Sequence, residues 1–369
     1  MKNYKNILNR FVIGLLIFIS SNLLHAKDYV TSTLVDNLSY PWSIAFLPNK
    51  DMLITEKTGS LRLIKNGKLL EKKITGLPKI YAQGQGGLLE VILDPNFASN
   101  KKLYLSYSSG TRNKNTLQVI SAKLDQLSLN EVSVILTVSP TRDTPHHYGG
   151  RMAFLPDGTL LVTSGEGFNF REQAQQLDSM LGKILRINTD GSIPKNNPFV
   201  GYKDVKAEIY SYGHRNPQAI LVAKDGVVWQ HEHGPKGGDE LNVISAGLNY
   251  GWPAITYGID YSGAIISPYT KAEGMQQPIT YWVPSIAPSG MTEYQGDIFP
   301  QWKGNLFVSA LAERSVHRLS LESGKVIAEE IILTELDSRI RDIRTGPDGH
   351  LYVLTDSSQG AVIKLSPAE

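Results

Sequence analysis

The chain has 369 residues, contains no cysteine and carries a formal net charge of +2. The absence of cysteine excludes disulfides and thiol catalysis, so the core alone must hold the fold together. The near balance of charge gives no sign of a surface for nucleic acid or membrane. With 33 glycines, 17 tyrosines and many short apolar runs, the composition is typical of an all-β protein with many tight turns.

The first 26 residues predict a secretory signal. Basic residues precede an apolar run over residues 11–19, and a small residue, Ala26, ends the segment. The run is shorter than the about 20 residues that a membrane-spanning helix needs, and an uncleaved anchor is the alternative. We therefore expect residues 1–26 to be removed and residues 27–369 to form one catalytic domain. The mature protein is expected to be periplasmic or secreted, with no membrane span.

A turn followed by a strand-like run recurs six times along the chain. In each copy, Pro, Asp, Asn or Gly residues precede a run rich in β-branched and aromatic residues. The copies lie roughly 45 to 80 residues apart, a period that favours a repeat architecture over a two-sheet sandwich. The pattern predicts a six-bladed β-propeller of four-stranded antiparallel blades, with one helix-like segment around residues 172–181. The copies include residues 46–64, 94–107, 154–162, 225–229, 302–308 and 346–354.

Two short motifs in the first half of the chain are candidates for chemistry. The glycine-rich run around Gln85 lacks the lysine and the helix of a phosphate-binding loop, so a tight turn is the favoured interpretation. His147 lies in the run from His146 to Arg151, directly before the third copy of the repeat. Because histidine is well matched to proton transfer near neutral pH, we expect His147 to be a base at the mouth of the fold.

Three arginines form the next candidate group. Arg215 stands beside Asn216 in a turn, and Arg339 and Arg341 alternate along a predicted strand, so both can face one way. Planar guanidinium groups suit carboxylates and phosphates. Three of them directed into one cavity would imply a ligand with several carboxylates. The alternative is that each caps a turn or pairs with a neighbouring acid such as Asp342.

Residues 231–240 offer two kinds of metal site. His231 and His233, if they share a strand face, could form a zinc site with His147. Exposed carbonyls and carboxylates in the same run favour calcium instead, and a solvated acidic turn is the alternative to both. The oxygen ligands available are the carbonyls of the Gly-Pro-rich loop and the carboxylates of Asp239 and Glu240.

Together these segments resemble the soluble aldose sugar dehydrogenases that use pyrroloquinoline quinone (PQQ). The likeness runs in order over nearly the whole mature chain and is most specific from Tyr212 to Pro253. That family is a six-bladed propeller, in agreement with the repeat. The segments that carry the resemblance are Gln85 in its glycine loop, His147-Tyr-Gly-Gly-Arg, Gly213-His-Arg-Asn-Pro-Gln, Glu232-His-Gly-Pro-Lys-Gly-Gly-Asp-Glu, Asn249-Tyr-Gly-Trp-Pro and Arg339-Ile-Arg-Asp.

The resemblance implies oxidation of an aldose at its anomeric carbon to the lactone. It implies that His147 is the general base, that Arg215 stabilises the developing oxyanion, and that hydride passes to the quinone with Ca²⁺ as Lewis acid. The three carboxylates of PQQ would account for the arginines. The matching cofactor contacts are Gln85, Arg215, Asn216, Tyr261, Arg339 and Arg341; the matching calcium ligands are Gly234 and Pro235 at the quinone and Asp239, Glu240 and Tyr250 at a second, structural site; Trp282 is a further candidate for the pocket wall.

One position departs from the family pattern, and two other functions stay open. Family members commonly have lysine where Ala312 stands, so cofactor binding should be weakened unless Arg314 reaches the cofactor.

The alternative functions are a calcium-dependent propeller hydrolase or lactonase, with His147 as base to a water, and a non-enzymatic ligand-binding propeller. The expected partners are an aldose substrate and an external electron acceptor, with no nucleic acid; the protein would be a monomer or a homodimer.

Overall fold

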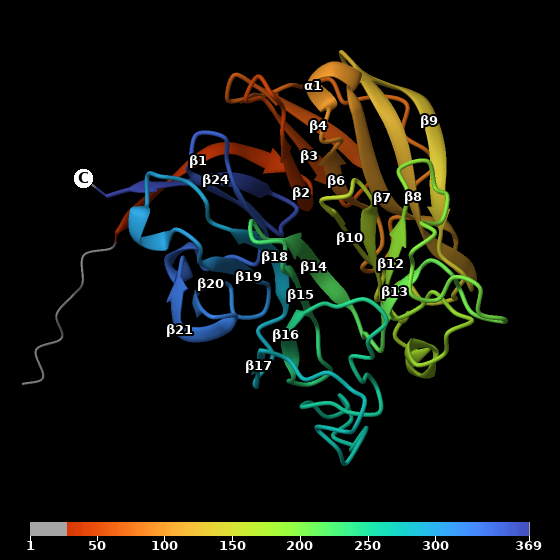
Figure 1. Ribbon diagram of the computed structural model, residues 1–369. Helices are drawn as coiled ribbons and strands as arrows, with labels where there is room; N and C mark the ends of the chain where they lie inside the picture. Colours follow the sequence, from red (N-terminus) through yellow and green to blue (C-terminus); the bar gives the residue numbers. More distant parts are fainter. Residues whose placement is uncertain (1–27, 369) are drawn as a thin grey trace, which may run out of the picture.

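The computed structural model describes residues 28–368. The predicted signal segment, residues 1–26, lies outside the described residues. Within the described range, 24 strands form six sheets of four strands each, and the sheets are arranged around a common centre (Figure 1). The prediction of a six-bladed β-propeller is therefore confirmed.

Five blades are built from strands that follow one another in the chain, each strand pairing antiparallel with the next. The first three consist of β2 (Pro41–Phe46), β3 (Met52–Glu56), β4 (Ser60–Lys65) and β5 (Lys68–Leu69); β6 (Leu88–Leu93), β7 (Lys102–Thr111), β8 (Lys114–Asp125) and β9 (Ser128–Thr137); and β10 (Gly149–Phe154), β11 (Leu160–Ser164), β12 (Lys183–Ile187) and β13 (Ile209–Tyr212). The next two consist of β14 (Pro217–Val222), β15 (Val228–Glu232), β16 (Asp239–Val243) and β17 (Thr280–Trp282); and β18 (Pro288–Glu293), β19 (Leu306–Ala310), β20 (Val316–Glu322) and β21 (Lys325–Ile332).

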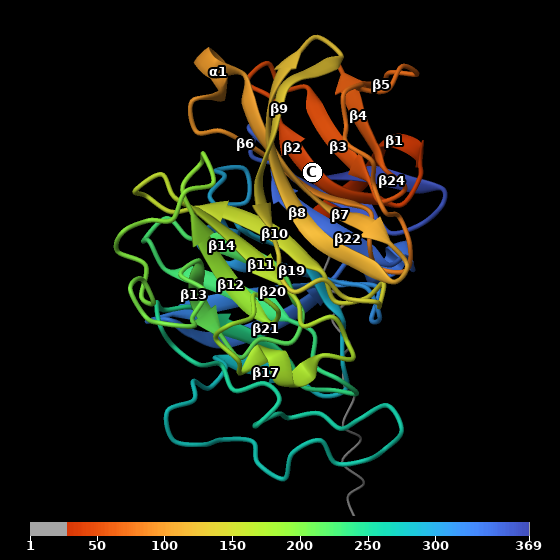
Figure 2. The same cartoon turned by 90° about the vertical axis from the view of Figure 1, so that its right-hand side faces the viewer.

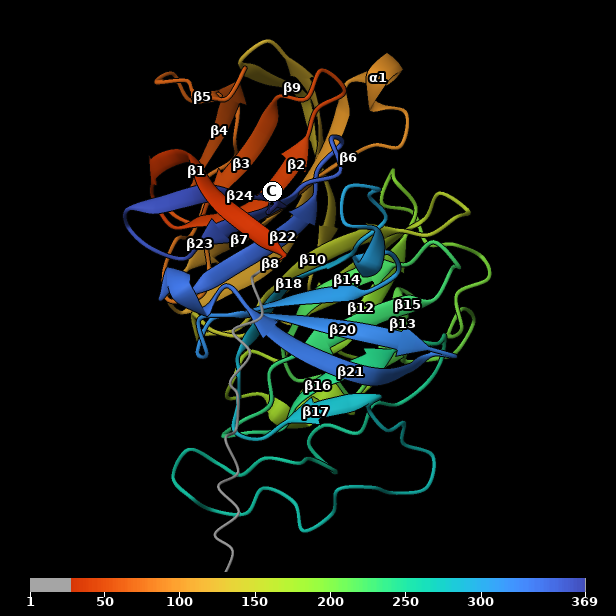
Figure 3. The ribbon, with the colours of Figure 1, turned by 90° about the vertical axis from the view of Figure 1, so that its left-hand side faces the viewer.

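The sixth blade joins the two ends of the described chain. Its inner strands are β22 (Ile340–Thr345), β23 (Leu351–Thr355) and β24 (Gly360–Pro367), and its outermost strand is β1 (Tyr29–Leu38). β1 pairs antiparallel with β24 along its length, and Figure 3 shows the two strands side by side. This pairing closes the ring, so the first and last blades are neighbours rather than free ends.

The turns predicted from the repeat join the first and second strands of the blades. In the third blade, the amide of Leu155 donates to the carbonyl of Thr159 and the amide of Gly158 donates to that of Leu155, both at 2.9 Å. Gly158 has φ of 82°, a conformation that glycine adopts without steric cost. The strand-like run of each copy is the second strand of a blade, namely β3, β7, β11, β15, β19 and β23.

The prediction of a helix around residues 172–181 is wrong over most of that range. The structure has only a 3₁₀ turn there, η1 (Arg171–Ala174). The Nζ atom of buried Lys183 donates to the carbonyls of Gln173, Ala174 and Leu181 at 2.7, 3.0 and 2.7 Å. A side chain thus occupies carbonyls that a continuing helix would use for its own hydrogen bonds. The other short helices are α1 (Phe97–Asn100), η2 (Pro300–Trp302) and η3 (Thr334–Leu336).

Residues 28–368 include no helix long and apolar enough to cross a membrane.

The innermost strands of the six blades, β2, β6, β10, β14, β18 and β22, contact one another around the centre. Since neighbouring strands are antiparallel, the starts of the innermost strands and the ends of the second strands lie on the same face of the ring. On one side, residues 244–279 between β16 and β17 extend well beyond the blades (Figure 2).

Candidate active site

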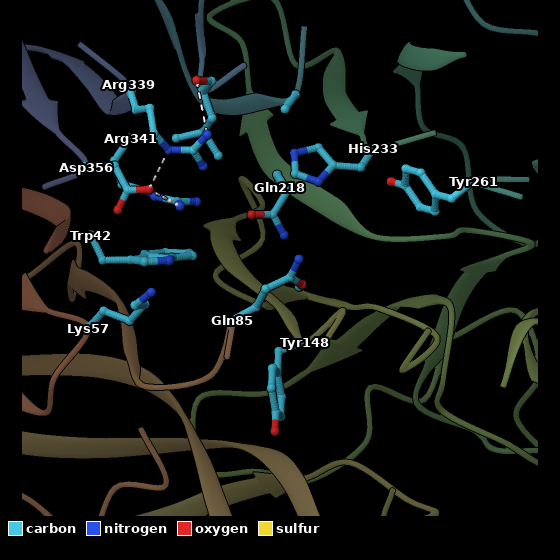
Figure 4. Close-up of a pocket in the computed structure, with 13 residues that line it drawn as sticks. Trp42, Lys57, Gln85, Tyr148, Gln218, His233, Tyr261, Arg339, Arg341 and Asp356 are labelled. Carbon is cyan, nitrogen blue, oxygen red and sulfur yellow. Dashed lines mark hydrogen bonds and ion pairs between the residues drawn. The ribbon is translucent and has the colours of Figure 1, made fainter. Parts of the chain in front are cut away.

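A cavity of about 300 Å³ lies on this face, and we call it the cationic cavity (Figure 4). The starts of the innermost strands supply Trp42, Gly149, Gln218 and Arg341, while residues that directly follow second strands supply others. Because six blades converge here, residues far apart in the chain line one space. The full lining is Trp42, Lys57, Gln85, Tyr148, Gly149, Gln218, His233, Tyr261, Ala287, Leu311, Arg339, Arg341 and Asp356.

The charge of the cationic cavity is strongly positive. Lys57, Arg339 and Arg341 line it, against a single carboxylate, Asp356. Oδ2 of Asp356 lies 3.4 Å from Nε of Arg339 and 2.9 Å from Nη2 of Arg341. Burial alone would raise the pKa of Asp356, but the two arginines outweigh it and hold that pKa below its usual range. The cavity therefore keeps unpaired positive charge and suits an anion.

Arg339 and Arg341 do not pair with Asp342, the acid named in the alternative interpretation; they pair with another carboxylate, Asp356. Asp342 is completely buried and pairs instead with Arg151 at 3.1 Å and with Arg344 at 3.1 Å. Arg339 and Arg341 share Asp356, as described above, and both reach the cavity. The prediction that they face one way agrees with this placement.

His147 is held in an uncommon backbone conformation by two side chains. Its φ is 50°, in the left-handed region that non-glycine residues rarely adopt. Its amide donates to Oε1 of Gln85 at 2.8 Å, and its carbonyl accepts from Nη1 of Arg142 at 2.6 Å. A Cβ on Gly165 would lie 2.3 Å from the same carbonyl. Gln85, a predicted cofactor contact, therefore also fixes the predicted base.

The imidazole of His147 pairs with Glu166, which follows the second strand β11. Nδ1 of His147 lies 3.1 Å from Oε1 of Glu166, and both side chains are buried. Burial, together with the positive charge of Arg215, lowers the pKa of His147 well below its ordinary value. Burial raises the pKa of Glu166 to about 7, although the positive charge of Arg215 opposes the shift. The pair thus contains a neutral imidazole and a carboxyl group that titrates near neutral pH.

The protonation of Glu166 decides which nitrogen of His147 is free. When Glu166 is ionised it can only accept, so Nδ1 of His147 carries a proton and Nε2 is left as a base. When Glu166 is protonated it can donate to Nδ1, and the proton of the imidazole then resides on Nε2. In the ionised state of Glu166, Nε2 of His147 is therefore the unprotonated nitrogen, as the predicted base requires.

A smaller cavity of about 160 Å³, which we call the side cavity, adjoins the cationic cavity through Tyr261, which lines both. His147 is buried and is not among the lining residues of either cavity, but residues in contact with it line both. Its chain neighbours Tyr148 and Gly149 line the cationic cavity, and Glu166 lines the side cavity. Its ring makes an edge contact with Phe168 at 5.2 Å between centroids. The lining is Glu166, Phe168, Asn169, Arg171, Arg215, Pro235, Trp252, Asp260, Tyr261 and Ile266.

Arg215 and the Gly234–Pro235 loop also meet at the side cavity. Nη1 of Arg215 donates to the carbonyls of His233 and Gly234, at 3.2 and 2.6 Å. The loop is fixed by Asp239, whose Oδ1 accepts from the amide of Gly234 at 2.8 Å. The carbonyl of Gly234, predicted as a calcium ligand, thus accepts a hydrogen bond from a guanidinium in this structure. The structure gives Asp239 a positioning role, because its Oδ2 is also engaged, by Ser285 and Ala287 at 2.6 and 2.9 Å.

The three histidines do not form the zinc site considered from the sequence. Nε2 of His233 lies 2.7 Å from the carbonyl of Pro288, so it must carry the proton there. Burial lowers the pKa of His233 to about 4 and that of His231 to about 3, so both rings are neutral near pH 7. Among the residues that the structure describes, no three His, Asp or Glu side chains gather as a metal site.

The remaining predicted residues lie behind or away from the cavities. Asn216 is buried, and its Oδ1 accepts from the amide of Gly149 at 3.3 Å, so it braces the His147 loop. Glu240 lies directly across from Glu232 in the β15–β16 pair. Burial, followed by the charge of Glu232, raises the pKa of Glu240 to about 8. The hydroxyl of Tyr250 donates to the carbonyl of Val243 at 2.8 Å.

Trp282, a candidate for the pocket wall, and Arg314, a possible substitute for the missing lysine, both lie outside the cavities. Trp282 does not line either cavity; it lies in the outermost strand of its blade, and its Nε1 donates to Glu329 at 2.8 Å. Arg314 does not reach the cationic cavity, because its Nη1 pairs with Asp337 at 2.7 Å on the exposed surface. The loss of a lysine at Ala312 is therefore not compensated by Arg314.

Sequence reasoning missed Glu166, Lys57 and Asp356, none of which belongs to a recognisable motif. Lys57 and Asp356 directly follow the second strands β3 and β23, and Glu166 comes two residues after β11. The only sequence feature that could have identified these three residues is their position within the repeat. The residues just after each predicted second strand must lie on the same face as the His147 loop, whatever their type.

The fold is a six-bladed propeller, and one face of it carries a cationic cavity beside a buried His–Glu pair. Over residues 38–364 the sequence matches the family described as Glucose / Sorbosone dehydrogenase, and the chain belongs to that family. It is therefore an oxidoreductase of the sugar dehydrogenase class.

Individual relatives agree with this assignment. Aldose sugar dehydrogenase YliI of Escherichia coli is 45% identical over 361 residues, covering 95% of this chain and 97% of the relative. Quinoprotein glucose dehydrogenase B of Acinetobacter calcoaceticus is 26% identical, covering 90% and 86%. The crystal structure of the E. coli soluble aldose sugar dehydrogenase in the apo-form superposes with a TM-score of 0.89 at 43% identity, covering 92% of this chain and all of that one.

Proposed function

We propose that this protein oxidises aldose sugars at the anomeric carbon to the lactone, with PQQ as cofactor and calcium as its metal. The observation that carries the proposal is the position of the His147–Glu166 pair beside a cationic cavity and a side cavity. The first cavity suits an anionic cofactor and the second a neutral polar substrate. The export signal predicted from the sequence would place this reaction in the periplasm or outside the cell, with an external electron acceptor.

The residues of the cationic cavity fit PQQ, which carries three carboxylates. Three cationic side chains line the cavity, and the buried Nε of Arg341 has no acceptor among residues 28–368. A carboxylate of the cofactor would satisfy this donor and offset the positive charge. Gln85, whose Oε1 accepts from His147, would present its amide NH₂ to the same ligand, and Trp42 would pack against the ring system.

Two groups of oxygen atoms fit calcium. At the quinone, the carbonyls of Gly234 and Pro235 are the candidates, held in place by Asp239. At the second site, Glu240 lies across from Glu232, and the buried Oδ1 of Asn242 has no donor within the described chain. Carboxylate and amide oxygens are ligands that calcium prefers, and a divalent cation would relieve the repulsion between the two carboxylates. Glu240 of β16 and Tyr250 of the loop that follows β16 would thus act from the same blade.

The cofactor and the side chains of the site would each have a separate role in the oxidation. Bound PQQ would supply the two-electron acceptor, with calcium polarising its C5 carbonyl. Nε2 of His147 would take the proton from the anomeric hydroxyl, while Glu166 holds Nδ1. The guanidinium of Arg215 would stabilise negative charge that develops in the transition state. Phe168 and Tyr261 stack with 6.5 Å between centroids, and with Trp252 they give the side cavity apolar walls for a sugar.

Reconstitution tests the proposal directly. The purified protein would receive calcium and PQQ, and reduction of an artificial dye would be followed with a panel of aldoses. We expect turnover that chelation suppresses and that His147→Ala lowers by about 10²–10⁴-fold, the usual contribution of a positioned base. Absence of turnover with every aldose, after cofactor binding has been verified, would defeat the proposal. Hydrolysis of lactones without any quinone would support the hydrolase instead.

A further inference from the structure

Lys57 is a cation of the cationic cavity that no sequence motif identifies. It directly follows β3 (Met52–Glu56) and is half-buried. In Figure 4 it lies beside Trp42, on the side of the cavity where Arg339 and Arg341 also lie. The cavity therefore receives positive charge from two neighbouring blades, the first and the sixth.

The position of Lys57 in its blade is one that the fold uses repeatedly to line this cavity. His233, Leu311 and Asp356 directly follow the second strands of their own blades, β15, β19 and β23, and all three line the cavity. Lys57 occupies the equivalent position in the first blade. Its presence at the cavity follows from the propeller geometry and is not the chance orientation of a surface lysine.

The side chain of Lys57 packs closely against neighbouring residues. A Cβ on Gly87 would lie 2.0 Å from the carbonyl oxygen of Lys57 and 2.7 Å from its Cγ, so the glycine permits this close packing. The ammonium lies 5.0 Å from the ring centroid of Tyr40 and donates to the carbonyl of Gly84 at 3.3 Å. These contacts are with neutral groups, so among residues 28–368 no carboxylate directly contacts this positive charge.

The groups around Lys57 leave its charge uncompensated. Burial lowers the pKa of Lys57, Asp356 opposes that shift, and Arg341 and Arg339 add to it. Asp356, however, is already bonded to both arginines. Three cations thus share one carboxylate, which leaves a net charge of +2 for a ligand to neutralise.

We infer that Lys57 binds a carboxylate of the cofactor and supplies the third cation of its site. The inference rests on the proposed function, because it assigns the ligand of the same cavity. It also accounts for Ala312 and Arg314: the first has no charge, and the second is paired with Asp337 outside the cavity. The positive charge comes from the first blade instead.

Binding of PQQ to the calcium-loaded apoprotein tests this inference without any assay of turnover. Trp42 lines the cavity, so quenching of tryptophan fluorescence provides the readout of the dissociation constant. We expect Lys57→Met to weaken binding about 10- to 100-fold, as expected for the loss of one hydrogen bond to a charged group. Lys57→Arg, which keeps the charge, is expected to bind more tightly than Lys57→Met.

Two control variants separate this role from a general effect of charge. Lys65→Met removes an exposed lysine at the end of the next strand, β4, and Arg314→Met removes the alternative cation. Both are expected to bind PQQ as the unmodified protein does. Thermal melting of each variant checks that it is folded before titration.

The results distinguish this inference from the proposed function. If the unmodified protein binds PQQ and oxidises aldoses, but folded Lys57→Met binds PQQ equally well, the role of Lys57 is refuted and the proposed function stands. Weakened binding in Arg314→Met, with none in Lys57→Met, would refute it in the same way. If the unmodified protein binds no PQQ, both proposals fall together.

Discussion

The backbone of His147 is bonded at both of its polar groups before any ligand arrives. Its amide is held by Gln85 and its carbonyl by Arg142, while its ring is held by Glu166. The two backbone contacts hold the loop in its left-handed conformation, and the contact with Glu166 fixes the orientation of the imidazole of this proposed base. A base that is positioned in advance does not have to be ordered during the reaction. The cost is a carboxyl group buried where it ionises with difficulty.

The pH dependence of turnover should report the ionisation of Glu166. Because the free base on Nε2 requires an ionised Glu166, we expect kcat/KM to rise with pH through an apparent pKa near 7, set by burial of that carboxyl. The low pKa of His147 keeps protonation of the imidazole from limiting the rate in this range. Glu166→Gln should lower kcat/KM by about 10²-fold and abolish the step near pH 7. An unchanged profile in Glu166→Gln would show that another group titrates.

The same carboxyl group should destabilise the fold at alkaline pH. Its folded pKa of about 7 lies above the ordinary value of 4.5, so its favourable contribution is complete below about pH 4.5 and is lost as pH rises through 7. Glu166→Gln removes an ionised buried group and should raise the free energy of unfolding by about 1–3 kcal/mol above pH 7. Denaturant titrations at pH 4.5 and pH 8 measure this. Equal differences at the two pH values would contradict the burial of an ionisable Glu166.

At the scale of elements, the residues of the site lie at or just beyond the ends of strands, and not in the middle of them. β11 ends at Ser164, and Gly165 must follow it because a Cβ there would lie 2.3 Å from the carbonyl of His147 and 2.9 Å from Oδ1 of Asn216. The glycine lets two blade elements pass closely enough for Glu166 to reach the imidazole. The hairpin turn at Gly226, on the opposite face, has no such restriction, because the space around that glycine is open.

Gly165→Ala should displace the His147 loop. The added methyl group meets backbone atoms, which cannot rotate away, so we expect a loss of about 1–3 kcal/mol in stability and a lower kcat/KM in the reconstituted enzyme. Gly226→Ala is the matched control: it adds the same methyl group at a positive φ of 88° in open space. It should lower stability through backbone strain alone, with kcat/KM preserved. Equal kcat/KM in both variants would mean that the close approach at Gly165 is not required.

The same elements show what could be predicted from the sequence. The turns and second strands follow from local residue preferences, so the six blades and the faces of Arg339 and Arg341 could be predicted. Glu166 and Lys57 could not be, because their role depends on which blades become neighbours. Trp282 was misplaced for a related reason: an aromatic residue near a site motif can equally lie in an outer strand and pack between blades.

At the scale of the whole molecule, one buried side chain links the blades across the centre of the ring. Arg151 of β10 donates to Glu90 at 3.3 Å, to Asp342 at 3.1 Å, and to the carbonyls of Gln218 and Ser289 at 2.9 and 3.0 Å. Its guanidinium also lies 3.9 Å from the ring centroid of Trp42. It thus contacts the innermost strand of every other blade. Together with the β1–β24 pair, it fixes the ring on which the site depends.

Arg151→Met should therefore destabilise the entire propeller. Removing one partner leaves the buried carboxylates of Glu90 and Asp342 with less compensation, a change that typically costs about 3–5 kcal/mol. Arg318→Met is the control, because Arg318 pairs with the half-exposed Glu330 near the rim and its loss should cost about 0–1 kcal/mol. Chemical denaturation compares the two variants. Similar midpoints and slopes for both would show that the central contacts add little to stability.

The central claim, that His147 initiates oxidation at the anomeric carbon of a sugar beside the quinone, is tested most directly by a single-turnover experiment. The protein loaded with calcium and PQQ would be mixed anaerobically with an aldose carrying either hydrogen or deuterium at C1, and the quinone spectrum would be followed. We predict reduction of one quinone per lactone formed, slower with deuterium, and severely slowed in His147→Ala. Verified cofactor binding without reduction of the quinone, or reduction at the same rate in His147→Ala, would contradict the account.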